Sequence, residues 1–411
     1  MNFEFFIAQR MRSSSTSEST VSGRIIKIAI AAIALGMVMM LIALGTSLGL
    51  QREIKAKTIA LSGDIRIAPF ENNNSSISIT PIDTTALRKD SWWDKNQVAH
   101  LYPYVAKGVL LKTKSEFEGG VVKGVDQNFP WEKLFPYLLE GSFPVFDSTL
   151  SKEIVLSQTL AQKLKLNLGD RVTAYFQNDD PGAVPRIRYF NLVAIYQTGF
   201  PDFDNSFAFV DIKQVQKING WTDRQIGGVE VFLKPKANAI PYAEKIYTEL
   251  PPHIDVQRVD QLYQGIFDWI ALFDFNVLII LIVMILVGTL NMTTALLVLI
   301  LERSRMVGVL KSLGANNRQI QKVFLWNAVY IILRGLIWGN VLGLSFLVGQ
   351  SYFGWIALDP ATYFVSTVPI ALPIPLFIGL NLLVLGVCSL LLWIPSLIVG
   401  RIDPTEVVRF R

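Results

Sequence analysis

Side chains that could carry out covalent or metal chemistry are few in this sequence and stand apart from one another. The two histidines are His100 and His253, and the single cysteine, Cys388, lies in an apolar run. A histidine triad or metal site needs partner side chains, and a disulfide or cysteine metal site needs a second thiol. We therefore interpret both histidines as surface or lightly packed residues, and we expect no catalytic residue, bound metal or cofactor in this chain.

The sequence does not predict a nucleotide-hydrolysing site either. The phosphate-binding motif G-x-x-x-x-G-K-[ST] requires a Gly-Lys pair, which the sequence lacks. The run "LSGD", Leu61 to Asp64, is similar to the signature loop of ABC ATPases but has no phosphate-binding loop to accompany it. With only two isolated histidines, we expect no Ser-His-Asp or Cys-His constellation either. We predict that the chain by itself is not an enzyme.

A basic segment, "SRMVGVLKSLGANNRQI", lies between two long apolar runs. Apolar residues recur at helical spacing on one face, at Met306, Val309, Leu310 and Leu313. Arg305 and Lys311 give this short helix a basic edge, and Gly314 supplies a C-terminal stop. One apolar stripe with a basic edge could fill a groove on another protein, or it could lie on anionic lipid. The first alternative would let the helix transmit force from a soluble motor.

A second polar feature is "QNDDPGAVPRIRYF", Gln177 to Phe190. Its acids, Pro-Gly pair and second proline lie between strand-like runs and predict a protruding turn or hairpin. The segment could be a solvated loop, or it could be a docking element, because Arg and aromatic side chains often anchor interfaces. The candidate docking residues are Pro185, Arg186, Arg188, Tyr189 and Phe190.

Arg334 interrupts an apolar run that begins at Val323. At a rise of 1.5 Å per residue, it would lie on the order of 16 Å along that helix, inside a bilayer. An arginine there costs about 2.5–3.5 kcal/mol and usually faces a polar partner. Asn327 and Asn340 lie in the same run. We expect either a structural hydrogen-bonding role for Arg334 or a role in substrate binding or gating.

The elements that must position these residues are membrane helices and one water-exposed domain. The chain of 411 residues is 51% hydrophobic and 17% charged, which is too apolar for an ordinary soluble protein. Four runs are long enough to cross a bilayer. They are 28–50, 275–301, 323–350 and 376–399, where Pro369, Pro373 and Pro375 delay the start of the fourth. The first run is longer than a signal peptide needs, so we interpret it as an uncleaved anchor.

Residues 51–274, between the first two runs, predict a large α+β domain. Strand-like runs such as "GDIRIAPF", "GGVVKGV", "FNLVAIYQTG" and "VEVFLKP" alternate with helix-like segments such as "LSQTLAQKLKL" and "IPYAEKIYTEL". The fold class is therefore an α-helical membrane protein with four transmembrane helices and an α+β extracytoplasmic domain inserted between helices 1 and 2. Residues 351–375 would form a loop on the same side as this domain.

Charge predicts the orientation of the spans. The segments 1–27, 302–322 and 400–411 together hold 12 cations and five acids, whereas 51–274 holds 25 cations and 27 acids. By the positive-inside rule, the three basic segments and both termini lie in the cytoplasm. The net charge of +5 therefore reflects membrane topology and does not indicate nucleic-acid binding.

Several motifs resemble the FtsX/MacB-like family of ABC transporter permeases. "SRMVGVLKSLGANNRQIQKVF" is similar to the family's coupling segment, "FFIAQRMRS" to the amphipathic elbow before the first span, and "RIDPTEVVRFR" to the final tail. "SLGLQREIKAKTIALSGDIRI" and "KEIVLSQTLAQKLKLNLGDRV" resemble the lipoprotein-releasing branch with a MacB-like core domain. The order of these motifs covers nearly the whole chain.

The resemblance implies a non-catalytic inner-membrane subunit, with ATP and Mg²⁺ bound by a partner. Two permease protomers, identical or different, would pair with two copies of a LolD-like ATPase. In the lipoprotein-releasing branch, the resemblance implies release of lipoproteins from the outer leaflet of the inner membrane to a LolA-like periplasmic carrier, which docks on a hook in the outer domain. Gln177 to Phe190 falls where the hook would be, although it is shorter. The basic segment 302–322 would be the coupling helix.

Two alternatives to lipoprotein release stay open. An FtsX-like regulator would use the same movement to activate a periplasmic hydrolase, and a MacB-like exporter would move peptides or drugs. For a lipoprotein cargo, acyl chains need an apolar route through protein, because each CH₂ exposed to water costs about 0.8 kcal/mol. The candidate acyl-chain path comprises Met37, Met40, Leu41, Phe267 and Phe273, which could instead be packing or lipid-facing residues.

Overall fold

The structure is a computed structural model that describes Ile7 and residues 21–73, 76–87, 89–147, 149–177, 184–235 and 237–397. The chain divides into two compact units. The helical unit comprises Met1–Arg52, Trp269–Ala357 and Thr367–Arg411, and the α+β domain comprises Glu53–Asp268 and Leu358–Ser366. Most of the predicted elbow, and all of the predicted tail 400–411, lie outside the described residues.

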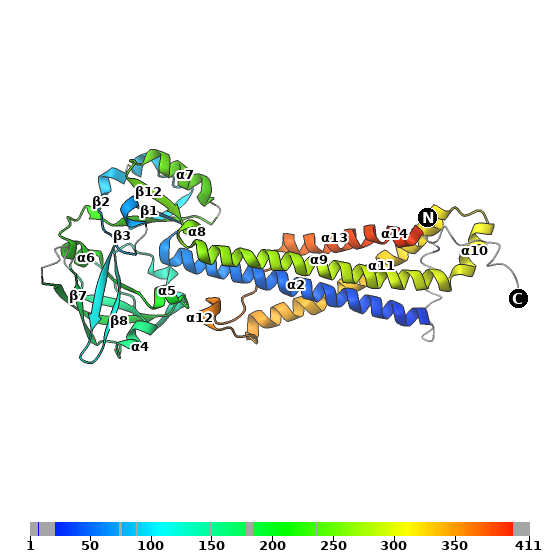
Figure 1. Cartoon of the computed structure of the whole chain (residues 1–411), viewed down its shortest axis with the longest axis horizontal. Coiled ribbons are helices and arrows are strands. Elements are labelled where there is room, and N and C mark those ends of the chain that lie inside the picture. Colours follow the sequence, from blue (N-terminus) through cyan, green and yellow to red (C-terminus); the bar gives the residue numbers. More distant parts are fainter. Residues whose placement is uncertain are drawn as a thin grey trace. The chain divides into compact units, whose positions relative to one another are not determined.

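Four long apolar helices are confirmed (Figure 1). They are α2 (Val21–Ser62), α9 (Gln264–Glu302), α11 (Asn317–Phe353) and α13 (Ile374–Leu391), which is followed by the short α14 (Trp393–Ser396). Each is long and apolar enough to cross a membrane. Pro373 caps the start of α13, consistent with the effect predicted for the prolines before it. A short helix α10 (Ser304–Ser312) joins α9 to α11, and the one-turn α12 (Pro360–Tyr363) lies between α11 and α13.

The two helices that flank the α+β domain in the sequence extend well beyond the predicted spans. Helix α2 continues past Leu50 to Ser62, and α9 begins at Gln264 instead of Phe275. No glycine or proline interrupts the chain between Leu50 and Ser62, so the helix ends only at Gly63, which has a left-handed φ of 72°. Residues 51–62 and 264–274, assigned to the domain from sequence, are therefore helical, and 53–62 and 264–268 group with the α+β domain.

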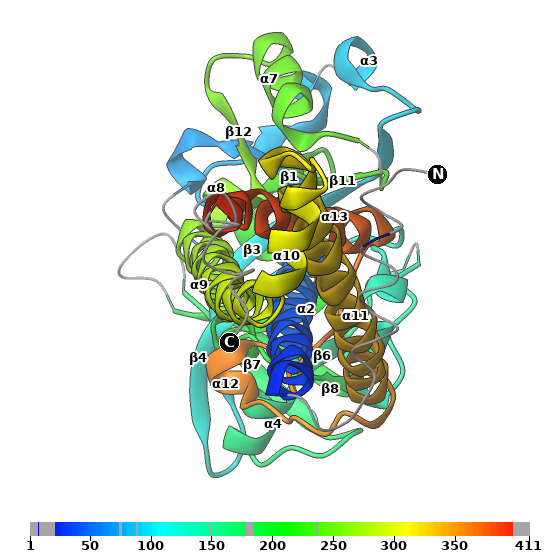
Figure 2. The same ribbon diagram turned by 90° about the vertical axis from the view of Figure 1, so that its right-hand side faces the viewer.

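Helix α11 packs closely on α2 through a stripe of glycines. Gly335, Gly339 and Gly343 recur every four residues and face α2. A Cβ added at Gly339 would lie 2.6 Å from the Met37 Cβ and 2.8 Å from the Ala34 carbonyl oxygen. The end-on view shows α2, α9, α11 and α13 side by side around this contact (Figure 2). The shared core includes Met37, Leu41, Met292, Leu296, Ile300, Phe324, Ile332, Leu380 and Val384.

The α+β domain contains β1 to β12 in the described part of the chain, between α2 and α9 in sequence. The strands are β1 (Ile65–Pro69), β2 (Ile82–Asp83), β3 (Val98–Lys112), β4 (Phe117–Val125), β5 (Leu138–Gly141), β6 (Glu153–Ser157), β7 (Arg171–Phe176), β8 (Arg186–Tyr196), β9 (Phe207–Asp211), β10 (Gln225–Ile226), β11 (Gly228–Leu233) and β12 (Ile254–Arg258). The α-helices are α3 (Lys89–Trp92), α4 (Gln158–Lys163), α5 (Pro201–Asp204), α6 (Ile212–Asn219), α7 (Ala239–Glu249) and α8 (Val259–Leu262). Short 3-10 turns occur at η1 (Phe70–Asn72), η2 (Thr84–Leu87), η3 (Trp131–Lys133) and η4 (Phe135–Tyr137).

Strand β3 is shared by two parts of the domain. Its first half pairs with β11, which continues to β1 and β12, and its second half pairs with β4 and β7. Tyr104 is the changeover residue, because it pairs with both Gly228 of β11 and Val125 of β4. The pairings β3–β4–β9–β6–β8–β7–β3 close a ring, in which β4–β9 and β6–β8 are parallel.

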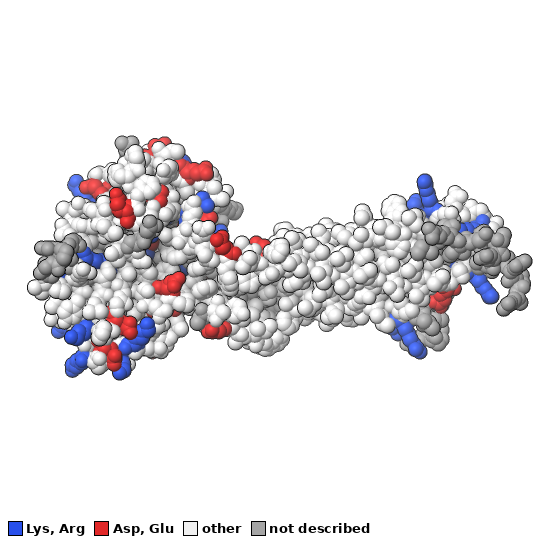
Figure 3. All heavy atoms as spheres, in the orientation of Figure 1, with Lys and Arg blue, Asp and Glu red and all other residues white. Residues whose placement is uncertain are grey.

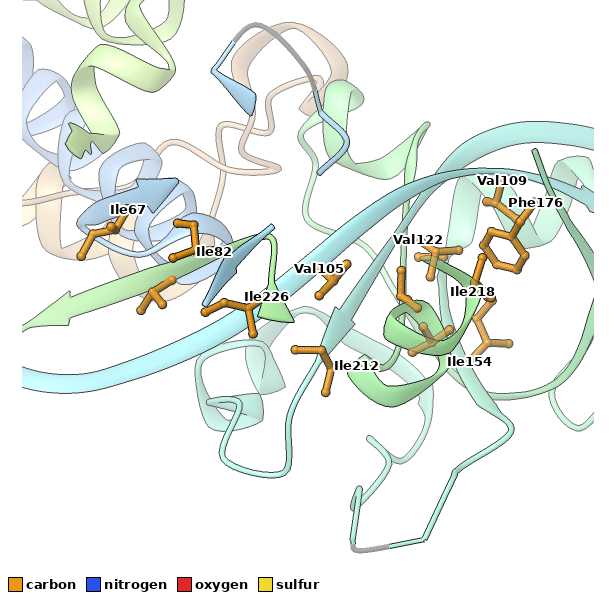
Figure 4. Packing of buried hydrophobic residues seen from close by; sticks show 14 of the residues in the cluster. Ile67, Ile82, Val105, Val109, Val122, Ile154, Phe176, Ile212, Ile218 and Ile226 are labelled. Carbon is orange, nitrogen blue, oxygen red and sulfur yellow. The ribbon is translucent and has the colours of Figure 1, made fainter. Parts of the chain in front are cut away.

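One buried hydrophobic cluster fills both parts of the domain. Ile67, Ile82 and Ile226 gather beside the β1–β11 part, whereas Val109, Phe176 and Ile154 fill the strand ring (Figure 4). Val105 and Ile212 lie between the two groups (Figure 4). A continuous core makes the domain one folding unit, and it confirms the α+β class predicted from the alternating strand-like and helix-like runs.

The glycine stripe leads to the first prediction. Gly339→Ala should lower the free energy of unfolding by about 1–3 kcal/mol, because the new methyl group overlaps the Ala34 carbonyl oxygen on α2. The measurement is the thermal unfolding midpoint of the purified chain in detergent. Gly386→Ala on α13 is the matched control, since no atom lies within 4 Å of its added Cβ. Equal midpoints for the two variants would contradict close α2–α11 packing.

Candidate functional site

The basic segment between α9 and α11 forms a well-defined hairpin. Helix α10 ends at Ser312, and Gly314 adopts a left-handed φ of 92°, as predicted for a C-terminal stop. The Ala315 N–H donates to the Leu310 carbonyl at 2.9 Å, and the Gly314 N–H donates to the Lys311 carbonyl at 3.0 Å. This is the hydrogen-bond pattern of a Schellman motif. Asn316 and Gln319 then form a capping box that starts α11.

The predicted apolar stripe of α10 divides into two parts. Met306 and Leu310 are partly buried and pack against the core of the helical unit, beside fully buried Val307. Val309 and Leu313 point outward instead and are 53% and 79% exposed. One part of the stripe therefore anchors the hairpin, and the other is free to contact a partner protein or lipid.

Basic side chains gather around this hairpin. Arg305, Arg318 and Lys322 are exposed, and Lys311 is half-buried. Figure 3 shows Lys and Arg at the α10 end of the helices, whereas the helix surface next to it is free of charged side chains on the face shown. The apolar pair Val309 and Leu313 thus lies within a basic surface.

The second predicted feature, Gln177 to Phe190, follows β7 and includes the first residues of β8. Phe176 at the end of β7 pairs with Arg186 at the start of β8, and residues 178–183 between them lie outside the described residues. The strand pairing agrees with the predicted turn. Figure 1 shows β7 and β8 next to each other in the domain.

The candidate docking residues of this segment differ in exposure. Pro185 and Tyr189 are exposed, and the Arg171 guanidinium lies 4.2 Å from the Tyr189 ring centroid. Arg188 is half-buried, and Arg186 donates to the Ile218 carbonyl of α6. Phe190 is fully buried in the domain core, so it cannot contact a partner, and its prediction as a docking residue is wrong.

The three residues of the predicted intramembrane polar site are not brought together. The Arg334 side chain is exposed on α11, and its guanidinium carbon lies 4.9 Å from the Tyr330 ring centroid. Asn327 is buried and donates to the Val323 carbonyl of its own helix. Asn340 instead pairs with Asn381 of α13 at 2.7 Å. The structural role therefore belongs to the asparagines, whereas Arg334 faces outward from this chain.

The candidate acyl-chain residues also separate. Met37, Met40 and Leu41 are at most 2% exposed and pack inside the helical unit, so they cannot line an open path in this chain. Phe267 and Phe273 of α9 are half-buried. The outward face of α9 is an exposed apolar surface, formed by Phe275, Leu278, Ile279, Ile282, Val283, Leu286, Val287 and Leu290.

A polar cluster at the end of α2 was not predicted from the sequence. Lys123 of β4 and Glu230 of β11 form an ion pair at 2.5 Å and are 6% and 4% exposed. The Lys123 ammonium also donates to the Leu61 carbonyl, close to the last residue of α2, at 2.9 Å. Nearby, the Ser62 and Tyr263 hydroxyls are hydrogen-bonded at 2.7 Å, which connects the end of α2 to the segment before α9.

Burial dominates the electrostatics of this cluster. It raises the pKa of Glu230, and the Lys123 ammonium partly opposes the rise. The pair lines a cavity of about 530 Å³ together with Arg66, Tyr104 and Tyr263. The sequence does hold a signal for this cluster, since Lys123 is the single charge in the apolar run "GGVVKGV" and Glu230 is the single charge in the apolar run "VEVFL". Within the described ranges, no group of three or more His, Cys, Asp and Glu side chains could hold a metal ion.

The described residues thus combine helices long and apolar enough to cross a membrane with a separate strand-rich domain. Residues 28–259 match the MacB-like periplasmic core domain, and residues 278–404 match the FtsX-like permease C-terminal region. The chain therefore belongs to the family of FtsX-like permeases with a MacB-like periplasmic core domain.

The similar proteins in this family include lipoprotein-releasing system transmembrane proteins. The chain is 24% identical to LolC of Neisseria meningitidis serogroup B over 93% of both chains, and 23% identical to LolE of Haemophilus influenzae over 90% of both. The periplasmic region of MacB from Actinobacillus actinomycetemcomitans aligns with 49% of this chain and 91% of its own, at 13% identity. The TM-score of this structural alignment is 0.36.

The Lys123–Glu230 pair gives the second prediction. Lys123→Met should lower the free energy of unfolding by about 3–5 kcal/mol, because it leaves the Glu230 carboxylate buried without its cation. The double variant Lys123→Met/Glu230→Met should recover most of the loss, since it removes both charges and keeps similar side-chain volumes. Thermal unfolding of the full chain in detergent measures both variants.

The same variant should respond to pH. Without Lys123, the folded-state pKa of Glu230 lies still further above its unfolded value, so the folded chain binds the proton more tightly than the unfolded chain does. The stability deficit of Lys123→Met should therefore shrink as the pH falls from 8 toward the unfolded value of about 4.3. A deficit that stays constant over this window would show that the carboxylate is not its cause.

Proposed function

We propose that this chain is the permease subunit of an ABC transporter that releases lipoproteins from the inner membrane, powered by ATP hydrolysis in a separate subunit. The observation that carries the proposal is the match along 93% of both chains to a lipoprotein-releasing LolC protein. A match of this length includes the helices, the coupling segment and the α+β domain together. Family membership alone would fit a regulator or an exporter equally well.

The charge pattern supports an orientation. The basic α10 hairpin would lie in the cytoplasm with both termini, and the α+β domain, with 25 cations and 27 acids over 51–274, would lie in the periplasm. In this orientation a cytoplasmic ATPase can reach α10. The lipoprotein and its carrier would meet the opposite end of the helices.

The α10 hairpin supports a coupling role. Val309 and Leu313 offer two exposed apolar side chains to a groove on the ATPase, and the surrounding cations would contact acidic groups at its rim. Met306, Val307 and Leu310 fix the same helix to the helical unit. A push on the exposed face would therefore move α9 and α11 and would not merely rotate a loose loop.

The exposed apolar face of α9 supports a route for the lipid anchor. Each acyl CH₂ brought into water costs about 0.8 kcal/mol, so the chains need a continuous apolar surface during extraction. Phe275, Ile279 and Ile282 belong to such a surface, whereas the buried residues of α2 do not. A second permease protomer facing α9 would close it into a cavity. Pro185 and Tyr189 remain exposed in the segment Gln177 to Phe190 for contact with a periplasmic carrier.

Depletion of the chain in its own cells tests the proposal. Lipoproteins destined for the outer membrane should accumulate in the inner membrane, as measured by membrane fractionation, because their extraction stops. Restoring the chain from a plasmid is the control. Filamentous cells with normal lipoprotein distribution would instead identify a regulator of a periplasmic hydrolase, and unchanged lipoproteins with drug sensitivity would identify an exporter.

The coupling role gives a further prediction. Leu313→Glu should weaken association with the copurifying ATPase at least about tenfold, because it places an acid at the centre of the exposed apolar pair. Leu313→Met is the matched control and should bind normally, since it keeps an apolar side chain of similar size. Affinity purification through a tag on this chain measures the ATPase recovered. Equal recovery with both variants would remove Leu313 from the interface.

A further inference from the structure

The segment between α11 and α13 belongs to the α+β domain and not to the helices that flank it. Leu358–Ser366 groups with the domain, whereas Ala357 and Thr367 on either side belong to the helical unit. The chain therefore passes between the two units four times: within α2, at the start of α9, and on both sides of this segment. If side-chain contacts hold Leu358–Ser366 on the domain, these contacts connect α11 and α13 to the domain. Without them, the connection would be the polypeptide chain alone.

The segment has a compact shape of its own. The Leu358 N–H donates to the Ser366 carbonyl at 2.9 Å, which closes its two ends. Helix α12 forms one turn inside it, and Phe364 follows with a left-handed φ of 62° that a bulky residue rarely adopts. This conformation exposes the Phe364 carbonyl to the domain and stacks the Phe364 ring on Phe200, with centroids 4.7 Å apart and planes at 18°. A strained residue persists only where its surroundings hold it.

Lys57 is the side chain that joins this segment to the rest of the domain. It extends from α2, is 8% exposed, and donates to the Phe364 carbonyl at 2.8 Å and to the Thr198 carbonyl at 2.9 Å. Its ammonium also lies 5.3 Å from the Tyr137 ring centroid. Among the described residues Lys57 forms no ion pair, so the two backbone carbonyls fix its position. Hydrogen bonds from a charged donor are stronger than those from a neutral one.

The loop that supplies the second carbonyl is held rigidly from its other side. Asp204 is 5% exposed and accepts hydrogen bonds from the Thr198 N–H at 3.0 Å, the Thr198 hydroxyl at 2.8 Å and the Gly199 N–H at 2.8 Å. Lys57 and Asp204 therefore hold opposite sides of the same backbone turn. The turn itself fits the segment closely, since a Cβ added at Gly199 would lie 3.4 Å from the Phe364 carbonyl oxygen.

We propose that Lys57 is a positioning residue that fastens Leu358–Ser366 to the α+β domain. The fastening makes the α11–α13 connection a third route, besides α2 and α9, by which helix movement reaches the domain. The fastening follows from the contacts of Lys57, and its use in transport rests on the proposed function. If Lys57 merely stabilised the domain, it would slow amide hydrogen exchange across the whole sheet. If it fastens the segment, it slows exchange selectively in Leu358–Ser366.

Hydrogen exchange of the full chain in detergent tests the fastening. Lys57→Met removes the ammonium and keeps a long apolar stem, so the amides of residues 358–366 should exchange at least about tenfold faster while those of β8 and β9 stay unchanged. Lys55→Met is the matched control, because Lys55 is exposed two residues away on the same helix. Lys57→Arg keeps a cationic donor and should restore part of the protection.

Release of lipoprotein by the complex with its ATPase tests the consequence. Lys57→Met should lower release at least about fivefold while ATP hydrolysis continues, and Lys55→Met should leave both release and ATP hydrolysis unchanged. Unchanged exchange at 358–366 would overturn the fastening, and so would faster exchange across the whole sheet. Normal release by Lys57→Met with the segment unprotected would overturn the third route. If the wild-type complex releases no lipoprotein, the proposed function fails. The exchange experiment would still show whether Lys57 holds residues 358–366 on the domain.

Discussion

The structure depends on how the carbonyl end of α2 is terminated inside the α+β domain. A helix ends with carbonyl groups that lack partners in the helix, and burying them unpaired is costly. Lys123 supplies a charged donor to Leu61, and Glu230 neutralises that donor. β1 begins at Ile65 and pairs with β11 and β12, so the sheet starts from this point. The Val259 N–H also donates to the carbonyl of Asp64 at 3.0 Å, which brings the segment leading to α9 to the same place.

Much of the fold could be predicted because its signals are local. Apolar length identified the four helices, and strand-like runs identified about half of the strands, among them β1, β4, β8 and β11. Strand β3, the longest, was not predicted, because Pro103 lies inside it and prolines usually exclude a segment from a sheet. The structure tolerates Pro103 where β3 passes from one part of the domain to the other. The ends of α2 and α9 were also missed, since hydropathy reports where a helix leaves lipid and not where its hydrogen bonds stop.

The candidate site was less predictable, because exposure depends on what packs nearby. The helical spacing of α10 placed Met306 and Leu313 on one stripe, but it could not reveal that the helical unit covers the first and leaves the second exposed. Phe190 alternates with outward-facing residues on β8, and only the ring closure shows that its side faces the core. Met37 was assigned to the acyl-chain path for a similar reason. It packs against glycines such as Gly339, which lie on α11, far away in the sequence.

Two buried lysines join the last turns of α2 to the rest of the α+β domain. The buried cations Lys57 and Lys123 both bind backbone carbonyls, one reaching out from α2 and one reaching toward it. A buried charge held by fixed dipoles resists displacement, because any shift leaves it unsolvated. Both lysines therefore make the last turns of α2 part of the domain.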